Sequence, residues 1–333
     1  MTTGPEPGVE QDASEPPATA SPAAGAAATG RTASPERLEA SLRALELTVR
    51  HRLDGLLQGN HVGLLPGPGS EPGDARPYQA GDDVRRMDWA VTARTTSPHV
   101  RETIADRELE TWAALDLSPS LDFGTADLEK RQLALAALTA VAHLTSGGGN
   151  RIGAVVTTGA TTLRLPARSG VAHARGLVRR VADTPRAEEG TRGDLTGALD
   201  QLRRPPRRRG LVAVISDFLG EPVWERSLRA LSGRHELLAI EIVDPRELEL
   251  PDVGTVVLAD PETGRQREVD TTPLLRREFA AAASAHRDRV AAALRRCGCA
   301  QLTLRTDSDW VADIVRFAVA RKHAQPTRAP GGR

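Results

Sequence analysis

Three oxygen-bearing side chains stand at alternate positions where a short apolar run of the sequence ends. The run is AALDLSPS, and it supplies Asp116, Ser118 and Ser120. A strand that leaves a sheet can direct residues i, i+2 and i+4 towards one point if the chain turns just after its last ladder bond, and hard cations bind such oxygen clusters. The alternative is structural, because Asp and Ser also gather where a loop caps the following helix. The spacing alone leaves both interpretations open.

A second acidic residue follows another strongly apolar segment. Leu211–Ser216 reads LVAVIS, which is typical of a parallel strand buried on both faces, and Asp217 follows it directly. In a doubly wound sheet, ligands bind beyond the carboxyl ends of the strands, where the strand order reverses. If the two strands are neighbours, Asp116 and Asp217 meet, and a divalent cation removes the cost of crowding two carboxylates. The pair of acids therefore favours a metal site.

The elements expected around these acids form one α/β domain, because strand and helix patterns alternate from residue 111 onwards. The expected strands are 111–117, 151–158, 161–165, 211–216, 236–243 and 301–305. The expected helices are 127–146, 171–182, 194–202, 222–232, 271–296 and 309–321. A tight turn at Gly159 makes 161–165 an antiparallel edge strand, and a hairpin is expected around 261–264. The fold class is a Rossmann-like, doubly wound, mostly parallel sheet with helices on both faces.

Four further segments flank this domain at residues 111–321. Residues 1–33 are rich in Ala, Pro, Gly, Ser and Thr and are predicted to be a disordered tail, as are residues 322–333. Residues 34–59 carry apolar side chains at steps of three and four, which predicts an amphipathic helix that packs on its own domain, with dimerisation as the alternative. Residues 60–110 form a polar segment that is expected to pack on the main domain.

Bulk composition excludes several classes of protein. The 333 residues include 44 basic and 44 acidic side chains, so no net charge attracts nucleic acid or anionic lipid. The arginine-rich stretch 203–209 lacks interleaved aromatic residues and reads as a solvated loop, which disfavours nucleic-acid binding. Only Lys130 and Lys322 are lysines, which we interpret as genomic base-composition bias. Two cysteines, the absence of an export signal in residues 1–30 and the absence of a long apolar run predict a cytoplasmic protein without a membrane span.

The run of Asp116, Ser118 and Ser120 with a later strand ending in Asp217 resembles the metal-ion-dependent adhesion site of von Willebrand factor A domains. The block GDDVRRMDWAVTAR resembles more narrowly a bacterial von Willebrand A-like family, domain of unknown function 58, which is often encoded beside MoxR-type AAA+ ATPases. The resemblance runs from about Tyr78 to Arg321 and includes DPETG, VDT and RTDSDW further along the chain. The residues of the block that carry it are Gly81, Asp82, Asp83, Arg85, Asp88, Trp89 and Arg94.

This resemblance implies a Mg²⁺ site, with Mn²⁺ or Ca²⁺ as alternatives, in which Asp116, Ser118 and Ser120 form the first loop and Asp217 the third. The second loop departs from the family pattern, because TRGDLTGAL puts Gly193 where such domains carry a Thr. The residues that could replace that Thr are Thr191, Asp194 and Thr196, and we assign Thr196. If none replaces it, a water fills the gap and the affinity for the cation weakens.

The function implied by the resemblance is a non-enzymatic, metal-dependent protein-binding module. Its partner would be a MoxR-type AAA+ ATPase in protein remodelling or complex maturation, and the module would be a monomer or weak dimer. The alternative is a metal-dependent phosphoesterase that uses the same cluster. An aspartyl-nucleophile phosphatase would need a second Asp where Ser118 stands, and the chain has neither HExxH nor a Walker loop. The polar block itself reads as a structural layer of ion pairs, with Val84, Met87, Trp89 and Val91 expected to be buried.

Overall fold

The main domain is built on a six-stranded sheet with the strand order β10-β7-β6-β3-β4-β5. The computed structural model describes residues 75–78, 87–95, 97–101, 109–126, 128–145, 149–188, 190–203 and 210–324, with Ala44, Leu47, Thr48 and Arg52. The strands are β3 (Glu110–Asp116), β4 (Arg151–Thr157), β5 (Thr162–Ser169), β6 (Gly210–Ser216), β7 (Glu236–Val243) and β10 (Ala300–Arg305). All neighbouring strands are parallel except β4 and β5, which are antiparallel. The predicted fold class and its antiparallel edge are confirmed.

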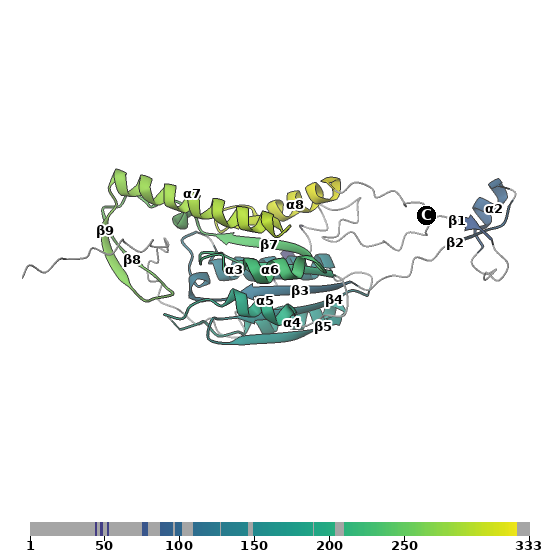
Figure 1. Ribbon diagram of the computed structural model, residues 1–333, viewed down its shortest axis with the longest axis horizontal. Coiled ribbons are helices and arrows are strands. Elements are labelled where there is room, and N and C mark those ends of the chain that lie inside the picture. The colour runs from purple at the N-terminus through teal and green to yellow at the C-terminus, as the bar shows by residue number, and fades with distance from the viewer. Residues whose placement is uncertain are drawn as a thin grey trace, which may run out of the picture.

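Helices cover both faces of this sheet (Figure 1). One face carries α3 (Lys130–Thr145), α4 (Val171–Ala182) and α8 (Trp310–Ala324). The other face carries α5 (Leu195–Arg203), α6 (Glu225–Ser232) and α7 (Pro273–Arg296). The helix α8 continues three residues beyond the predicted end at Arg321, into the segment expected to be a tail.

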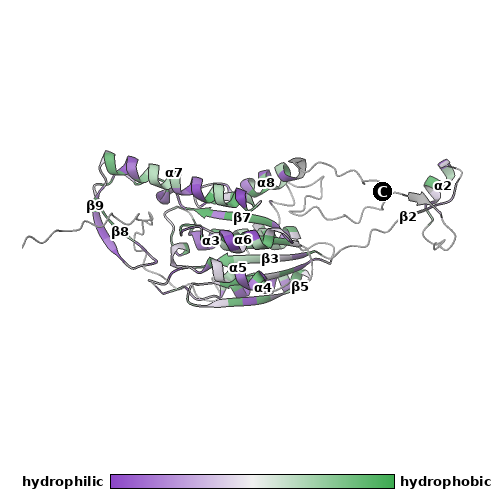
Figure 2. Cartoon of the chain, in the orientation of Figure 1, coloured by the Kyte–Doolittle hydropathy of each residue, from purple (hydrophilic) through white to green (hydrophobic). Residues whose placement is uncertain are grey.

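The central strands are buried on both sides because their side chains alternate between two apolar clusters. In β3, Ala113 and Leu115 pack in the cluster of α3, whereas Trp112 and Ala114 pack in the cluster of α5. Figure 2 shows β3 and β7 as largely hydrophobic arrows, while the covering helices carry hydrophilic residues. This double burial is why the strands read as continuous apolar runs in the sequence.

The chain turns sharply after β6, because Phe218 adopts a positive φ of 52°. Residues other than glycine rarely occupy this region, and surrounding contacts must hold them there. The Phe218 backbone N–H donates to Ser216 Oγ (3.0 Å), and the Phe218 ring packs edge-to-face on Trp224 at 5.3 Å between centroids. His286 of α7 also contacts the Phe218 carbonyl oxygen (2.9 Å). The turn that carries Asp217 is therefore fixed from both sides.

A two-stranded hairpin, β8 (Thr255–Ala259) and β9 (Gln266–Asp270), follows β7 as the sequence predicted. It leads into α7, whose first residues are mostly exposed and whose buried residues begin at Ala283. Figure 1 shows the hairpin arching from the start of α7 across the end of the sheet where β3 and β7 finish.

A small antiparallel pair, β1 (Ala75–Pro77) and β2 (His99–Arg101), flanks α2 (Trp89–Thr95). Asp88 caps α2, because its Oδ1 accepts the Val91 backbone N–H (3.1 Å). Trp89 was expected to be buried, but 70% of it is exposed, and α2 contributes no residue to the apolar clusters of the described residues. Residues 79–86, with Gly81, Asp82, Asp83 and Arg85 of the family block, lie outside the described residues. That the segment 60–110 packs on the main domain stays a prediction.

Four residues of the predicted N-terminal helix are described, and all four are helical. One of them, Arg52, donates from Nη2 to Asp309 Oδ2 at 2.5 Å. This contact joins the helix to the residue that precedes α8, and the packing of the whole helix on its own domain stays a prediction. Residues 1–33 lie outside the described part of the chain, as do residues 204–209 of the arginine-rich stretch.

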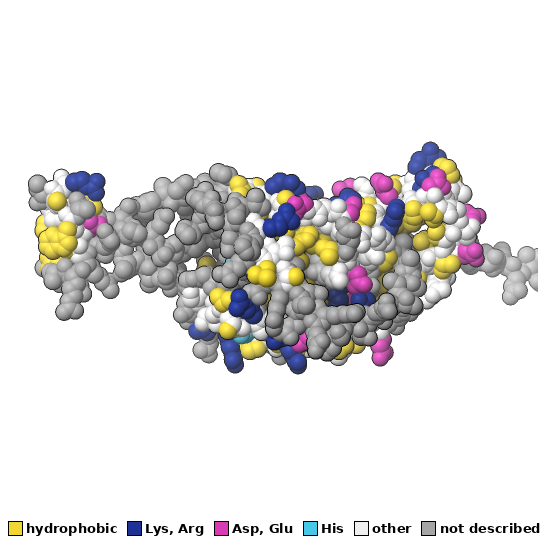
Figure 3. All heavy atoms as spheres, turned by 180° about the vertical axis from the view of Figure 1, so that it is seen from behind, with side chains coloured by type: hydrophobic (Ala, Val, Ile, Leu, Met, Phe, Trp, Pro, Cys, Tyr) yellow, Lys and Arg dark blue, Asp and Glu magenta, His cyan; other side chains and the backbone are white. Residues whose placement is uncertain are grey.

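The surface charges are of mixed sign, as the equal numbers of basic and acidic residues predicted, and the two cysteines are thiols. Figure 3 shows basic and acidic side chains interspersed over the face that it draws. Cys297 and Cys299 are free and buried, and burial raises the pKa of the Cys299 thiol to about 12. None of the described helices is both long and apolar enough to span a bilayer.

Candidate functional site

The two predicted acids end neighbouring parallel strands. β3 pairs with β6 in register from Glu110 with Gly210 to Leu115 with Ile215, so Asp116 and Asp217 emerge side by side at one edge of the sheet. If the six strands are renumbered 1 to 6 in the order in which they occur in the chain, their order across the sheet is 3-2-1-4-5-6. The order changes direction between the first and fourth of them, which are β3 and β6. Ligands of doubly wound folds bind at such a reversal. The acids thus stand where the topology creates a crevice.

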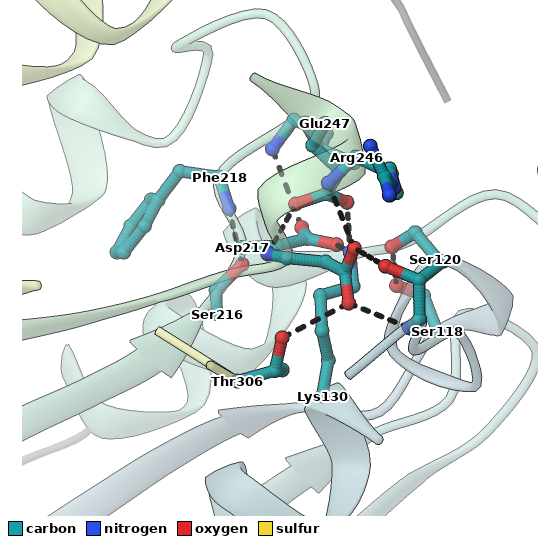
Figure 4. Close-up of polar contacts among 12 residues, drawn as sticks. Ser118, Ser120, Lys130, Ser216, Asp217, Phe218, Arg246, Glu247 and Thr306 are labelled. Carbon is teal, nitrogen blue, oxygen red and sulfur yellow. Dashed lines mark hydrogen bonds and ion pairs between the residues drawn. The ribbon is translucent and has the colours of Figure 1, made fainter. Parts of the chain in front are cut away.

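The loop after β3 brings the predicted hydroxyls to the same place. Asp116 Oδ1 accepts the Ser118 backbone N–H (3.0 Å), and the short 3-10 helix Pro119–Leu121 turns the chain back. Ser118 Oγ lies 3.1 Å from Ser120 Oγ, and Ser120 donates a hydrogen bond to the Asp217 carboxylate. Asp116, Ser118, Ser120 and Asp217 therefore form one connected cluster, as the spacing predicted, and Figure 4 shows Ser118, Ser120 and Asp217 of it.

Asp116 is a buried acid without a cationic partner among the described residues. Burial raises the pKa of Asp116 to about 7, and the neighbouring charge of Asp217 adds to this effect. Hydrogen bonds from Ser118 and from Ser216, whose Oγ donates to Asp116 Oδ2 (3.2 Å), oppose it only in part. A cation placed here would replace the missing positive charge.

Asp217, unlike Asp116, has a cationic partner among the described residues. Lys130, the first residue of α3, is completely buried, and its Nζ lies 2.8 Å from Asp217 Oδ2. Burial alone would raise the pKa of Asp217, but the Lys130 ammonium and the hydrogen bonds from Lys130 and Ser120 outweigh it and lower the pKa. The same ion pairs keep the pKa of Lys130 above its usual value despite burial. Asp217 is therefore ionised and held within the protein.

Further charged groups surround Lys130. Its ammonium also donates to Glu247 Oε1, and Figure 4 shows Lys130, Asp217 and Glu247 converging. Arg287 of α7 closes the network: Nη1 donates to the Asp217 carbonyl oxygen (2.6 Å) and to Glu241 Oε1 (2.9 Å). Burial raises the pKa of Glu247 even though Lys130 opposes the effect. Each buried charge in this network has a partner, as low-dielectric surroundings require.

Another acid at the same edge is occupied entirely by structural hydrogen bonds. Asp244 follows β7, and its carboxylate accepts the Thr125 backbone N–H (2.8 Å) and hydroxyl (2.5 Å), the Thr306 hydroxyl (2.9 Å) and the Arg246 backbone N–H (2.9 Å). It ties three loops together and has no free oxygen for a ligand.

The second loop approaches the cluster through Gly193, the position where the resemblance implied a threonine. A Cβ built on Gly193 would lie 3.3 Å from Ser118 Oγ and 3.4 Å from Asp116 Oδ2. Asp194 is engaged as the cap of α5, because its Oδ1 accepts the Gly197 backbone N–H (2.8 Å). Thr196 lies in the first turn of α5, and its assignment as a ligand stays a prediction.

The donors fit a hard cation in part. Asp116, Ser118 and Ser120 offer a desolvated carboxylate and two hydroxyls, which is the ligand chemistry that Mg²⁺ and Ca²⁺ prefer. Gly193 adds no side-chain oxygen, and Asp217 is already bound by Lys130. Within the described residues, no three His, Cys, Asp or Glu side chains are grouped to hold a metal ion. A cation would therefore depend on the Asp116 loop, with water completing its shell.

Several residues of this site were not predicted from the sequence. They are Lys130, Ser216, Glu241, Glu247, Glu262 and Arg287. Lys130 carried the one usable signal, because it is one of two lysines among 44 basic residues. We interpreted this rarity only as base-composition bias.

The strand order and the position of the crevice define a Rossmann-like, doubly wound α/β module. The chain belongs to the family described as "Protein of unknown function DUF58", whose model matches residues 74–289.

Similar proteins occur in mycobacteria. Uncharacterized protein Rv1480 of Mycobacterium tuberculosis is 61% identical over 286 residues, which cover 86% of this chain and 90% of that protein. Uncharacterized protein MAV169 of Mycobacterium avium is 57% identical over 159 residues, or 48% of this chain and 94% of that one.

Two solved structures resemble the chain more distantly. One is the conserved hypothetical protein BatB of Bacteroides thetaiotaomicron, with 13% identity and a TM-score of 0.39 over 65% of this chain and all of that one. The other is a von Willebrand factor type A protein of Catenulispora acidiphila, with 15% identity and a TM-score of 0.34 over 67% of this chain and 42% of that one. No part of the site is inferred from these two structures.

Proposed function

We propose that this chain is a protein-binding module that recognises a partner through the edge of the sheet at Asp116 and breaks no bond. The observation that carries this proposal is the state of Asp116: a buried carboxylate, flanked by two hydroxyls, that lacks a positive partner within the described residues. A positive charge from outside the chain would stabilise the ionised form of this carboxylate. A divalent cation, bound by Asp116, Ser118 and Ser120, supplies that charge and binds an acidic group of the partner.

A MoxR-type AAA+ ATPase is the partner that we propose, since the sequence resemblance implies it. The module would act as its adaptor in protein remodelling or complex maturation. Membership of the DUF58 family supports this choice of partner only through that resemblance.

The phosphoesterase alternative is less well supported by the geometry. It would use both acids around one cation, but the Lys130 ammonium already binds Asp217 Oδ2 at 2.8 Å. A metal-activated water also needs a base within hydrogen-bonding reach. Asp217 is not free to serve as that base.

The first test measures cation binding by the isolated chain. Mg²⁺ or Mn²⁺ should raise the melting temperature of the wild-type protein as the concentration passes the dissociation constant, because a ligand that binds only the folded state stabilises it. Asp116→Ala should abolish the shift, and Asp288→Ala, on the exposed face of α7, should retain it. An equal shift in the wild type and Asp116→Ala would remove the cation from this site.

The second test measures binding of the MoxR-type ATPase by calorimetry. Because the ATPase itself needs Mg²⁺ for its nucleotide, all chains are compared at one Mg²⁺ concentration. Asp116→Ala should weaken binding at least about tenfold, which corresponds to roughly 1.4 kcal/mol, while Asp288→Ala binds as the wild type. Unchanged binding by Asp116→Ala would exclude this edge of the sheet as the recognition surface.

A further inference from the structure

The turn between β8 and β9 has a rigid, acidic tip, Asp260–Gly264. The Asp260 backbone N–H donates to the Arg265 carbonyl oxygen (2.8 Å), and the Gly264 N–H donates to the Asp260 carbonyl oxygen (2.8 Å). The Asp260 carboxylate accepts the Glu262 backbone N–H (2.9 Å) and the Thr263 hydroxyl (2.6 Å). Gly264 closes the turn with a φ of 68°, which glycine adopts without steric cost. These hydrogen bonds define the shape of the tip, which carries Glu262.

This tip docks on the second loop of the candidate site. The Gly190 backbone N–H donates to the Pro261 carbonyl oxygen (3.0 Å), and the Gly193 backbone N–H donates to the Glu262 carboxylate. Burial raises the pKa of Glu262, and the charge of Asp217 raises it further. The charge of Asp217 thus acts on Glu262, although the two residues belong to separate loops.

Gly193 connects this docked carboxylate to the cluster. The same glycine that donates to Glu262 lies against Ser118 and Asp116, within 3.4 Å of both for a Cβ built on it. Asp116, Ser118 and Ser120 stand at the edge of the sheet, yet each is less than a tenth exposed. The edge of the sheet that we propose as the recognition surface is therefore shielded from solvent at these three residues.

The rest of the hairpin is held at its base, where Arg276 of α7 pairs with Asp252 (2.9 Å) and the Val253 backbone N–H donates to the Thr271 hydroxyl (3.2 Å). β8 and β9 pair with each other and with no other described strand, and most of their residues are exposed. At the base, the Thr271 backbone N–H and hydroxyl both donate to the Gly254 carbonyl oxygen (2.8 and 2.7 Å). An isolated two-stranded hairpin is marginally stable in water. Its docked position therefore depends on the contacts at the tip and at the base.

We propose that the β8–β9 hairpin is an internal ligand of the recognition site, which Glu262 occupies until an acidic segment of a protein partner displaces it. The proposal rests on the proposed function, since it concerns access to the same site. A group that replaces Glu262 must accept the Gly193 N–H and match the positive charge of Arg192, which acts on Glu262. A carboxylate side chain of the partner meets both requirements.

The first experiment needs no partner. Amide hydrogen exchange is compared in the wild type, Glu262→Ala and the control Glu268→Ala, which removes an exposed carboxylate from β9 away from the tip. In Glu262→Ala, the amides of Gly190 and Gly193 should exchange at least about tenfold faster, because local opening sets their protection. The control should match the wild type. Exchange at Gly193 that is equally fast in the wild type and in Glu262→Ala would overturn the proposal.

The second experiment measures the affinity for the MoxR-type ATPase at constant Mg²⁺. Loss of the internal competitor should make Glu262→Ala bind about five- to tenfold more tightly, the size expected from the net contribution of one hydrogen bond. Binding that stays equal to the wild type, while Asp116→Ala still weakens it, would overturn the hairpin as a competitor and leave the proposed function in place. If Asp116→Ala also binds normally, the proposed function fails, and the proposal for the hairpin fails with it even if exchange shows a docked tip.

Discussion

Asp116 and Asp217 differ sharply although they end neighbouring strands and are almost equally buried. Asp217 has a lysine at 2.8 Å and an arginine on its carbonyl oxygen, and its pKa is lowered. Within the part of the chain that the structure describes, Asp116 has hydroxyl and amide donors but no cation, and its pKa rises to about 7. Among the described residues, an internal cation stands on the Asp217 side of the crevice and none on the Asp116 side. The comparison indicates that the Asp217 side is structural and that the Asp116 side is available to bind.

The largest effect should follow from removing the internal cation. Lys130→Met leaves Asp217 and Glu247 buried without their ammonium partner, and breaking one side of a buried ion pair costs about 3 to 5 kcal/mol. We expect a loss of this size in the free energy of unfolding in urea, followed by tryptophan fluorescence.

The matched control removes the stranded charges as well. The triple variant Lys130→Met, Asp217→Asn, Glu247→Gln should recover much of the lost stability, because no uncompensated charge stays buried. If Lys130→Met costs no more than an ordinary surface substitution, or if the triple variant is the less stable of the two, then Lys130 does not act as the internal cation.

The second prediction concerns the pH dependence of the metal-free protein in EDTA. The folded-state pKa of Asp116 is about 7, above the value of 3.8 for the unfolded chain, so the folded state holds its proton more tightly. The resulting stability is present below pH 3.8 and is lost as the pH rises to about 7. Above that pH, Asp116→Asn should be more stable than the wild type by at most about 4 kcal/mol.

Asp217 should show the opposite sign in the same urea titrations. Because its folded-state pKa is lowered, its contribution is present above the unfolded value and is lost as the pH falls. Asp217→Asn should therefore be less stable than the wild type at neutral pH. Parallel pH profiles for Asp116→Asn and Asp217→Asn would contradict the difference between the two sides of the crevice.

The sequence was sufficient to predict the sheet and the place of its acids. Strands buried on both faces must be apolar at every position, so β3 and β6 stand out as continuous runs, and the acids that follow them are easily located. The tight turn at Gly159, with a φ of 88°, similarly predicts the antiparallel edge strand β5. Burial and turn chemistry are local properties, and they leave a local pattern.

The partners of these acids could not be predicted in the same way. Lys130 meets Asp217 and Glu247 across 87 and 117 residues of sequence, and no periodicity encodes such a pairing. Its residue type was the available clue, since a compact ammonium fits an enclosed site that a guanidinium would overfill. Glu262 lies in a turn that reads simply as a hairpin, and only the folded chain shows where its tip docks.

The smallest effect should come from adding a ligand to the side that lacks a cation. Gly193→Thr places a Cβ 3.3 Å from Ser118 Oγ and 3.4 Å from Asp116 Oδ2, and Gly193 has no positive φ that would penalise a side chain. The added hydroxyl supplies a further oxygen to the Asp116 loop, so Mg²⁺ or Mn²⁺ affinity by calorimetry should rise by up to about tenfold, or roughly 1.4 kcal/mol. Gly193→Ala provides the same crowding without the oxygen and should not increase the affinity. Equal affinities for the Thr and Ala variants would mean that the second loop does not face the bound cation, and that Asp116 is completed by other means.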